Sequence, residues 1–218
     1  MKIKKILKII GIIVGILIIL LLVHTIRNYI IITDLQDKFS QYSDSSNYYI
    51  KSIATEDNGT IITMEYYSKD NKQVVFLERN INGETSKISM YDDGEKTDTF
   101  WDNKENKIVQ LDSETMIEIN IYNRLETDNN WQTFLGSIFA SVKSTNYNGK
   151  ECYIIKGFLS SNLLNFESAE IYVEKDTGLF VKAIEGSTTT EREYEFDNVE
   201  DTVFSEPDIS QYTVKAEE

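Results

Sequence analysis

The chain has 218 residues and a formal net charge of −14 at pH 7, with one histidine and one cysteine. The single cysteine excludes an internal disulfide and zinc sites built on several thiolates, and the single histidine leaves no material for a histidine-dependent catalytic triad or metal cluster. Residues 1–27 carry five basic and no acidic side chains, so the other 191 residues carry 17 basic and 36 acidic ones. This acidity argues against nucleic acid and against anionic lipid headgroups as partners of the main domain, because both are polyanions.

The first element predicted is a membrane-spanning helix. Residues 9–23 are apolar without interruption, and the run from Ile6 to Val23 would extend about 27 Å as a helix, close to the roughly 30 Å thickness of a hydrocarbon core. Lys2, Lys4, Lys5 and Lys8 precede it. By the positive-inside rule, this bias predicts a single-pass cell-membrane protein with a cytoplasmic N-terminus and an extracytoplasmic main domain.

A cleaved signal peptide is the alternative interpretation of the same segment, because it shares the basic start and the apolar centre. No small-x-small cleavage site follows Val23, which favours an uncleaved signal-anchor. No cysteine stands directly after the apolar run, which excludes lipoprotein processing. Gly11 and Gly15 form a Gly-x-x-x-Gly pair, the spacing at which two membrane helices can pack closely, and are candidates for helix dimerisation.

A second helical pattern follows the span, with Leu35, Phe39 and Tyr42 at positions i, i+4 and i+7. We expect the domain from about residue 45 onward to fold without the anchor. The predicted domain organisation is a cytoplasmic basic tail (1–8), a transmembrane signal-anchor (9–26), a juxtamembrane helix or linker (27–44), an extracytoplasmic β domain (45–212) and an acidic tail (213–218).

The main domain has the pattern of an antiparallel meander. Short segments of alternating apolar and polar residues are separated by turns rich in Asn, Asp and Gly, and Asn58-Gly59 and Asn82-Gly83 are strong hairpin signals. Strands are expected at 48–54, 60–68, 72–80, 84–91, 96–101, 107–111, 115–122, 151–159, 168–175, 179–185 and 191–199.

One strong helix is predicted inside this domain, at residues 130–143, with Asp128 or Asn129 as its cap. Its apolar residues fall at i, i+3, i+4, i+7, i+8 and i+11 and form one wide stripe. The stripe either packs as core over the concave face of the sheet or forms a mobile lid over a lipid-sized cleft, and it supplies the candidate ligand-binding residues. They are Trp131, Phe134, Leu135, Ile138, Phe139 and Val142.

Three stretches near the C-terminus carry a family resemblance: the strand-turn-strand segment 171–182, with its acidic-Thr-Gly turn; the Tyr- and Phe-containing strand 192–199; and the tail 203–208 with Phe204 and Pro207. Together they resemble the LolA/LolB-like lipoprotein-carrier superfamily. The resemblance implies an open antiparallel half-barrel whose concave face is plugged by helices and can hold acyl chains. Its motif residues are turn and core positions, so it carries over no ligand-contacting residue.

The predicted fold class is therefore mainly β with helices (α+β): an antiparallel open half-barrel of about ten or eleven strands with a covering helix, preceded by one transmembrane helix. The membrane anchor departs from the soluble carriers of that superfamily and favours a local role over a shuttle.

A ligand-binding function is suggested by segment 171–186, whose second arm is apolar on both faces. We expect a membrane-anchored binding protein for a lipid, an acylated protein or another hydrophobic ligand in the bacterial cell envelope. The alternative is a regulatory or structural envelope protein that binds another protein through its β domain.

No catalytic role, metal site or cofactor is expected, because the sequence lacks the usual nucleophile and phosphate-binding motifs and its acidic turns lack calcium-loop spacing. Cys152 shares a strand face with Ile154, so we expect it to be a small buried apolar residue.

Overall fold

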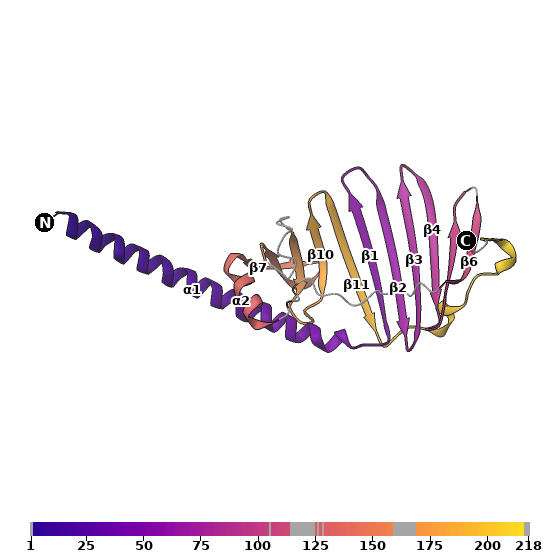
Figure 1. The fold of residues 1–218 in the computed structure, drawn as a ribbon, viewed down its shortest axis with the longest axis horizontal. Helices are drawn as coiled ribbons and strands as arrows, with labels where there is room; N and C mark the ends of the chain where they lie inside the picture. Colours follow the sequence, from indigo (N-terminus) through magenta and orange to yellow (C-terminus); the bar gives the residue numbers. More distant parts are fainter. Residues whose placement is uncertain are drawn as a thin grey trace. The chain divides into compact units, whose positions relative to one another are not determined.

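The computed structural model has two compact units. Unit 1 comprises Met1–Ser40 and Asn123–Phe180, and unit 2 comprises Gln41–Tyr122 and Val181–Glu218. Figure 1 shows the elements along the chain. The structure describes residues 2–104, 106–113, 125, 127, 129–158 and 169–215.

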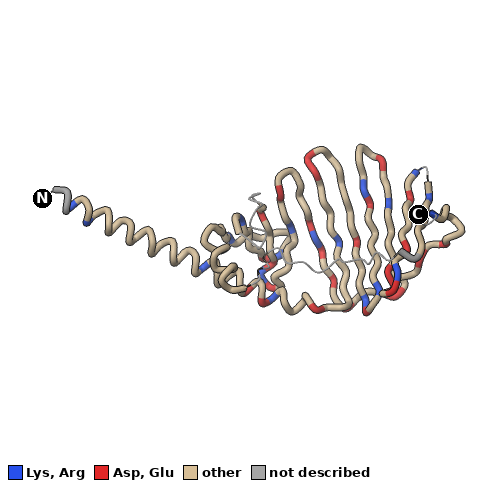
Figure 2. The backbone as a smooth tube through the Cα atoms, in the orientation of Figure 1, with Lys and Arg blue, Asp and Glu red and all other residues tan. Residues whose placement is uncertain are grey.

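A single helix, α1 (Lys2–Ser43), contains both the predicted span and the predicted juxtamembrane helix. From residue 5 to Val23 it is exposed apart from half-buried Gly15, and between Lys8 and Arg27 it carries no charged side chain (Figure 2). It is the one helix among the described residues that is long and apolar enough to cross a membrane. The second half differs, because Ile32, Leu35 and Phe39 are buried.

The other described residues of unit 1 form a second helix and three antiparallel strands in the order β9-β8-β7. Asn129 caps the helix by accepting a hydrogen bond from the Gln132 backbone N–H at 3.0 Å. The elements are α2 (Asn130–Phe139), β7 (Ser141–Tyr147), β8 (Lys150–Lys156) and β9 (Glu170–Glu174).

The predicted helix 130–143 was too long at its C-terminus. The helix ends at Phe139 and residues 141–147 form a strand that the sequence analysis did not predict. Val142 continued the helical apolar spacing, but it lies directly opposite Ile155 in the ladder with β8. The ladder satisfies the backbone groups of segment 141–147, in which β-branched Val142 and Thr145 favour a strand and the short polar Ser and Asn side chains disfavour a helix.

The turn that follows β9 packs directly on α1. Gly178 has a φ of 71° and an added Cβ there would lie 2.8 Å from the Phe39 backbone nitrogen and closer still to the Leu35 carbonyl oxygen. Lys38 Nζ donates a hydrogen bond to the Lys175 carbonyl oxygen at 2.7 Å. Only glycine can therefore occupy position 178, both for its backbone conformation and for the close approach of the helix.

Unit 2 contains most of the sheet, in the order β12-β6-β5-β4-β3-β2-β1-β11-β10. β12 pairs with β6 in parallel, and the other pairings with a described register are antiparallel. The elements are β1 (Tyr48–Glu56), β2 (Ile61–Lys69), β3 (Lys72–Ile81), β4 (Glu84–Asp92), β5 (Thr97–Asp102), β6 (Lys107–Ser113), β10 (Phe180–Glu185), β11 (Thr188–Phe196), the short 3₁₀ helices η1 (Asp201–Phe204) and η2 (Ile209–Gln211), and β12 (Thr213–Val214).

The twelve described strands belong to one open sheet, which confirms the predicted mainly-β class and its antiparallel meander. Asn82 and Gly83 both have positive φ, 52° and 84°, as the predicted two-residue hairpin turn requires. The predicted strand 115–122 lies outside the described residues.

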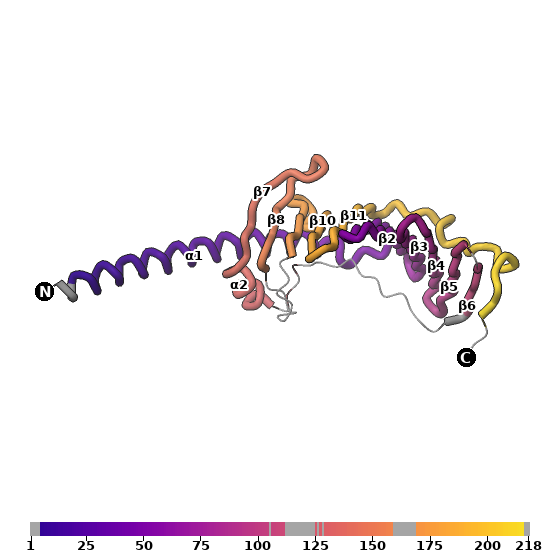
Figure 3. Tube along the Cα trace, turned by 90° about the horizontal axis from the view of Figure 1, so that it is seen from above, coloured from indigo at the N-terminus to yellow at the C-terminus, as the bar shows by residue number. Residues whose placement is uncertain are grey.

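The C-terminal segment of unit 2 runs along one face of its strands, as the view from above shows (Figure 3). Phe204 and Tyr212 from this segment pack against a buried cluster on that face. The cluster consists of Val74, Tyr91, Phe100 and Val109. One of the two apolar faces of unit 2 is therefore covered in part by the end of the chain itself.

Candidate functional site

The opposite face of the unit 2 sheet carries a continuous line of large apolar side chains, here called the apolar row. Its members lie directly opposite one another in register from β2 to β6. Residues that are directly opposite in a ladder point to the same side of the sheet. The apolar row consists of Met64, Leu77, Ile88, Trp101 and Ile108.

Every side chain of the apolar row is only half-buried. One step further along the same face, Tyr66 and Val75 are buried, whereas Met90 is half-buried. Four strand spacings separate the ends of the row, a length of about 19 Å. The row is therefore an elongated apolar strip that solvent reaches in this structure and on which an extended hydrophobic chain could lie.

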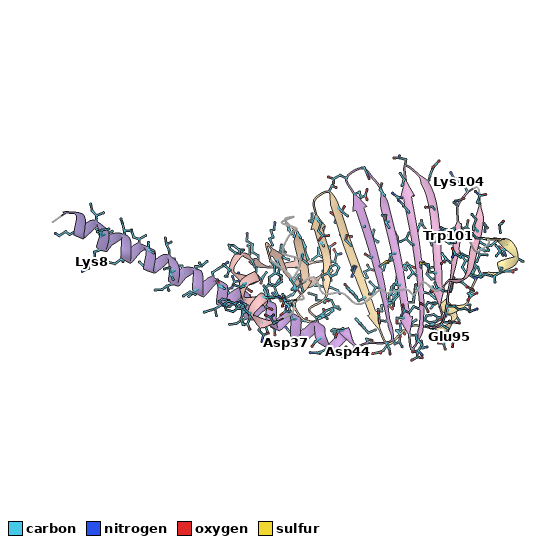
Figure 4. All side chains as sticks on the ribbon, viewed as in Figure 1. Lys8, Asp37, Asp44, Glu95, Trp101 and Lys104 are labelled. Carbon is cyan, nitrogen blue, oxygen red and sulfur yellow. The ribbon has the colours of Figure 1, made fainter. Side chains whose placement is uncertain are left out.

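A pocket of about 350 Å³ adjoins this strip at the turn end of strands β3 to β6. Two of its lining residues, Arg79 and Ser86, are paired in register one step beyond the Leu77–Ile88 pair of the row. Figure 4 shows Lys104 in the turn after β5, beyond Trp101. The pocket is lined by Arg79, Ile81, Glu84, Thr85, Ser86, Asn103 and Lys104.

The two cations of this pocket give the strip a polar end. An arginine and a lysine suit a phosphate or carboxylate group, the arginine because its planar fork can donate two parallel hydrogen bonds. Glu84 in the same pocket partly offsets their charge. The arrangement as a whole matches an amphiphile with an apolar tail and an anionic head.

The apolar row was not among the sites predicted from the sequence. The signal was present in β4, where Ile88 and Met90 alternate with Lys87 and Ser89. Each strand of this kind is common, however, and only the cross-strand register aligns Ile88 with Leu77 and Trp101.

A second pocket, of about 220 Å³, lies on the covered face beside the C-terminal segment and is lined by Asp92, Asp93, Asp98 and Glu206 among others. Asp92 and Asp93 accept hydrogen bonds from backbone N–H groups of the β4–β5 turn, from Gly94 at 2.7 Å and from Glu95 at 3.0 Å. These contacts are those of a structural turn. The described residues include no group of three or more His, Cys, Asp or Glu placed to hold a metal ion.

Glu206 is exposed as a residue, but partial desolvation of its carboxyl raises the pKa of that group, and the nearby negative charge of Asp98 raises it further. The folded protein then holds the Glu206 proton more tightly than the unfolded chain, so this group's contribution to stability falls as pH rises from 4.5 through the raised pKa. The pKa values of Asp93, Asp201 and Asp208 are instead lowered by hydrogen bonds, and for Asp201 by Lys69. Their contribution is present above pH 3.8 and is lost at lower pH.

We therefore expect Glu206→Gln to raise the urea midpoint of unit 2 at pH 8 more than at pH 4.5, because the variant removes the charge that desolvation and Asp98 disfavour. Trp101 fluorescence in a Trp131→Phe background would follow the transition. Glu95→Gln, at the exposed tip of the neighbouring turn (Figure 4), is the matched control and should show no such difference. A Glu206→Gln protein with the same pH dependence as the parent would contradict the assignment.

The six candidate residues of the predicted stripe do not form one surface in the structure. Trp131, Leu135 and Phe139 are exposed on α2 by 66%, 42% and 70%, while the buried side of α2 is formed by Thr133, Gly136 and Ser137. Phe134 and Ile138 are half-buried on the helix, and Val142 is buried in β7. Their role as a ligand-binding face stays a prediction.

The remaining residues singled out in the sequence are two exposed glycines of α1 and the buried cysteine. Gly11 and Gly15 lie on the exposed half of α1, where an added Cβ would meet no atom within 4 Å, and helix dimerisation there stays a prediction. Cys152 is fully buried, as expected for a small apolar residue, and burial raises the pKa of its thiol.

No protein-family model and no curated protein sequence matches this chain. Solved structures with a similar fold include an uncharacterised conserved protein from Thermus thermophilus, with a TM-score of 0.46 and 9% identity over 84% of this chain and 98% of its own. MucB in its complex with MucA(peri) has a TM-score of 0.37 and 12% identity, over 80% of this chain and 59% of its own.

A LolA superfamily protein from Nitrosomonas europaea has a TM-score of 0.25 and 10% identity, over 80% of this chain and 97% of its own. The superfamily that the C-terminal sequence resembles is thus also present among the structural neighbours. All three TM-scores lie below 0.5, so the function proposed below rests on residues of this chain.

Proposed function

We propose that this chain is a membrane-anchored, extracytoplasmic binding protein that holds the apolar part of a lipid or acylated protein on the apolar row. The observation that carries the proposal is the half-exposed line from Met64 to Ile108, which crosses five strands in register. A soluble domain gains about 25 cal/mol for each Å² of apolar surface that a ligand covers, so such a strip favours a hydrophobic occupant.

The composition of the strip supports an adaptable contact. Methionine is flexible and polarisable and fits ligands of irregular shape, and Met64 lies in the row with Met90 one step away. Arg79 and Lys104 in the adjoining pocket suit an anionic head group. No covalent chemistry is needed for this function, and none is proposed.

The apolar half of α1 supports a location at the membrane. Its side chains from Ile6 to Val23 are exposed, apart from half-buried Gly15, and no charge interrupts them between Lys8 and Arg27. With four lysines before the span, we propose that the N-terminus is cytoplasmic and the β domain lies outside. A cysteine added after Glu218 in a Cys152→Ser background should react with an impermeant thiol reagent on intact cells, and reaction only after lysis would contradict this orientation.

Ligand binding is tested at the centre of the apolar row with Ile88→Asn in a fragment of residues 24–218. Loss of this contact is expected to weaken binding of the hydrophobic dye 1-N-phenylnaphthylamine about tenfold, since an apolar side chain of this size contributes about 1.5–3 kcal/mol when it is fully covered. Dye fluorescence in a titration measures the change.

The matched control is Lys87→Asn, which changes the adjacent residue on the other face of β4. Lys87 is exposed and forms an ion pair with Glu78 at 2.9 Å, a kind of contact that contributes little to stability. Circular dichroism would confirm that both variants remain folded. A folded parent fragment that does not bind the dye, or equal weakening by both substitutions, would contradict the proposal and favour a role in protein binding.

A further inference from the structure

We propose that α2 is an interfacial helix whose exposed side enters the extracytoplasmic surface of the same bilayer that α1 spans, so that the domain has a second membrane contact. The proposal rests on the span assigned above to α1, and it concerns lipid as the occupant of the exposed α2 surface. All the residues involved belong to unit 1.

The position of α2 along α1 is set by a group of contacts just after the apolar run. His24 Nε2 lies 3.0 Å from the Ala140 carbonyl oxygen, and Asn28 Nδ2 donates to the same oxygen at 2.7 Å. Tyr29 and Phe134 make an edge-to-face ring contact at 5.9 Å. The end and the middle of α2 are therefore fixed at the level of α1 residues 24–29.

This level coincides with the expected membrane surface. Tyr29 lies six residues beyond Val23, the last residue of the uninterrupted apolar run, or about 9 Å along the helix axis. The polar headgroup region on each side of a bilayer is about 5–8 Å thick. A helix held between residues 24 and 29 of α1 would thus lie within or directly on this region.

The outward side of α2 has the composition of an interfacial helix. Trp131, Leu135 and Phe139 are spaced four residues apart and form one exposed stripe. Tryptophan and other amphipathic aromatic residues are enriched at membrane surfaces, where the ring is partly in contact with apolar chains. The Trp131 ring also stacks on Phe134 at 5.7 Å, which holds it on this side of the helix.

The buried side of α2 carries small and polar residues, whereas a helix that packs on a hydrophobic core buries apolar side chains. Thr133 and Ser137 are buried there, and Ser137 faces α1 through its carbonyl oxygen, which accepts from Asn28 at 3.4 Å. The polar side is therefore already satisfied by α1 and by the helix itself, and the apolar side remains outward.

The lack of charged side chains distinguishes α2 from the rest of the domain and favours lipid as the occupant of its exposed side. Residues 130–139 contain no charged side chain, although the chain after residue 27 is strongly acidic. The exposed apolar surface of α1 continues beyond the span through Ile26 and Ile30, which are 49% and 59% exposed. At this level α1 and α2 therefore both carry exposed apolar side chains.

The experiment uses the two tryptophans of the chain, Trp101 in unit 2 and Trp131 on α2. The full-length Trp101→Phe variant, in which Trp131 is the one remaining tryptophan, is reconstituted into phosphatidylcholine vesicles with and without brominated acyl chains. We expect Trp131 emission to be blue-shifted and to lose intensity with brominated lipid, most with bromines near the headgroup, since interfacial helices lie about 5–10 Å deep.

Flotation of the same vesicles separates this inference from the assignment of α1. A protein that floats with the vesicles but shows equal Trp131 emission in both lipids overturns the interfacial helix and leaves the anchor intact. A protein that does not float overturns the anchor, and the interfacial helix with it. Loss of dye binding by the apolar row has no bearing on either result.

A second reporter avoids changing Trp101. In a Cys152→Ser background, Phe139→Cys carries an environment-sensitive fluorophore, and Asp176→Cys, at the turn that packs near Leu35–Phe39, is the control further from the span. The label at 139 should report an apolar surrounding only in vesicles, and the label at 176 should report water in both conditions. Equal signals from the two positions would contradict the proposal.

Discussion

Replacing Gly178 with alanine is expected to lower the free energy of unfolding of unit 1 by about 2–5 kcal/mol. The new Cβ would meet the Leu35 carbonyl oxygen and lie 2.8 Å from the Phe39 backbone nitrogen, and its φ of 71° is unfavourable for any residue with a side chain. Backbone cannot move aside as a flexible side chain can, so helix and turn would have to separate. Urea unfolding of residues 24–218, followed by Trp131 in a Trp101→Phe background, measures the change.

Gly149→Ala, also in unit 1, is the matched control for this substitution. Gly149 also has a positive φ, 82°, but an added Cβ there meets no atom within 4 Å. Only the backbone conformational cost of about 1–2 kcal/mol is then expected. Equal destabilisation by the two substitutions would show that the close approach of α1 to Gly178 adds nothing.

The second large effect is expected from removing the second half of α1. A fragment of residues 45–218 lacks Ile32, Leu35 and Phe39, which are 0%, 0% and 5% exposed. Burial of three such side chains contributes about 5–9 kcal/mol, which is comparable with the whole stability of a typical domain. We therefore expect unit 1 to unfold in this fragment, with loss of amide-exchange protection in β7, β8 and β9.

A fragment of residues 24–218 is the control, because it removes only the exposed part of α1. It should keep the protection of β7 to β9. Protection of these strands in the 45–218 fragment would contradict the expectation and would support the domain boundary at residue 45 that the sequence analysis predicted.

The sequence determined the elements that depend on local pattern. Uninterrupted apolarity from residue 9 to 23 identified the first helix, and alternation with Asn-Gly turns located the strands of unit 2 to within a few residues. Asn82 and Gly83 illustrate why, since the positive φ of both residues is a property of the turn itself and needs no distant partner. The burial of Cys152 likewise followed from its place in an alternating strand.

Tertiary structure alone decided which surfaces are covered. The apolar spacing of 131–142 is the same whether the stripe points into a core or away from it, and the structure ends the helix at Phe139, pairs Val142 in a strand and turns Trp131 and Phe139 outward. Hydrogen bonds from the Asn28 side chain to the carbonyl oxygens of Ser137 and Ala140, more than 100 residues away in the chain, hold the C-terminal end of α2 against α1.

The apolar row was likewise decided by tertiary structure and not by local sequence pattern. A single strand with Ile88 on one side and Lys87 on the other is an ordinary half-buried strand, and its period of two cannot say what lies beside it. Register aligned Ile88 with Leu77 and Trp101 into one line, and the C-terminal segment covered the other face of these strands through Phe204 and Tyr212. Local pattern sets which way a side chain points, whereas contacts between residues far apart in the chain set what it meets.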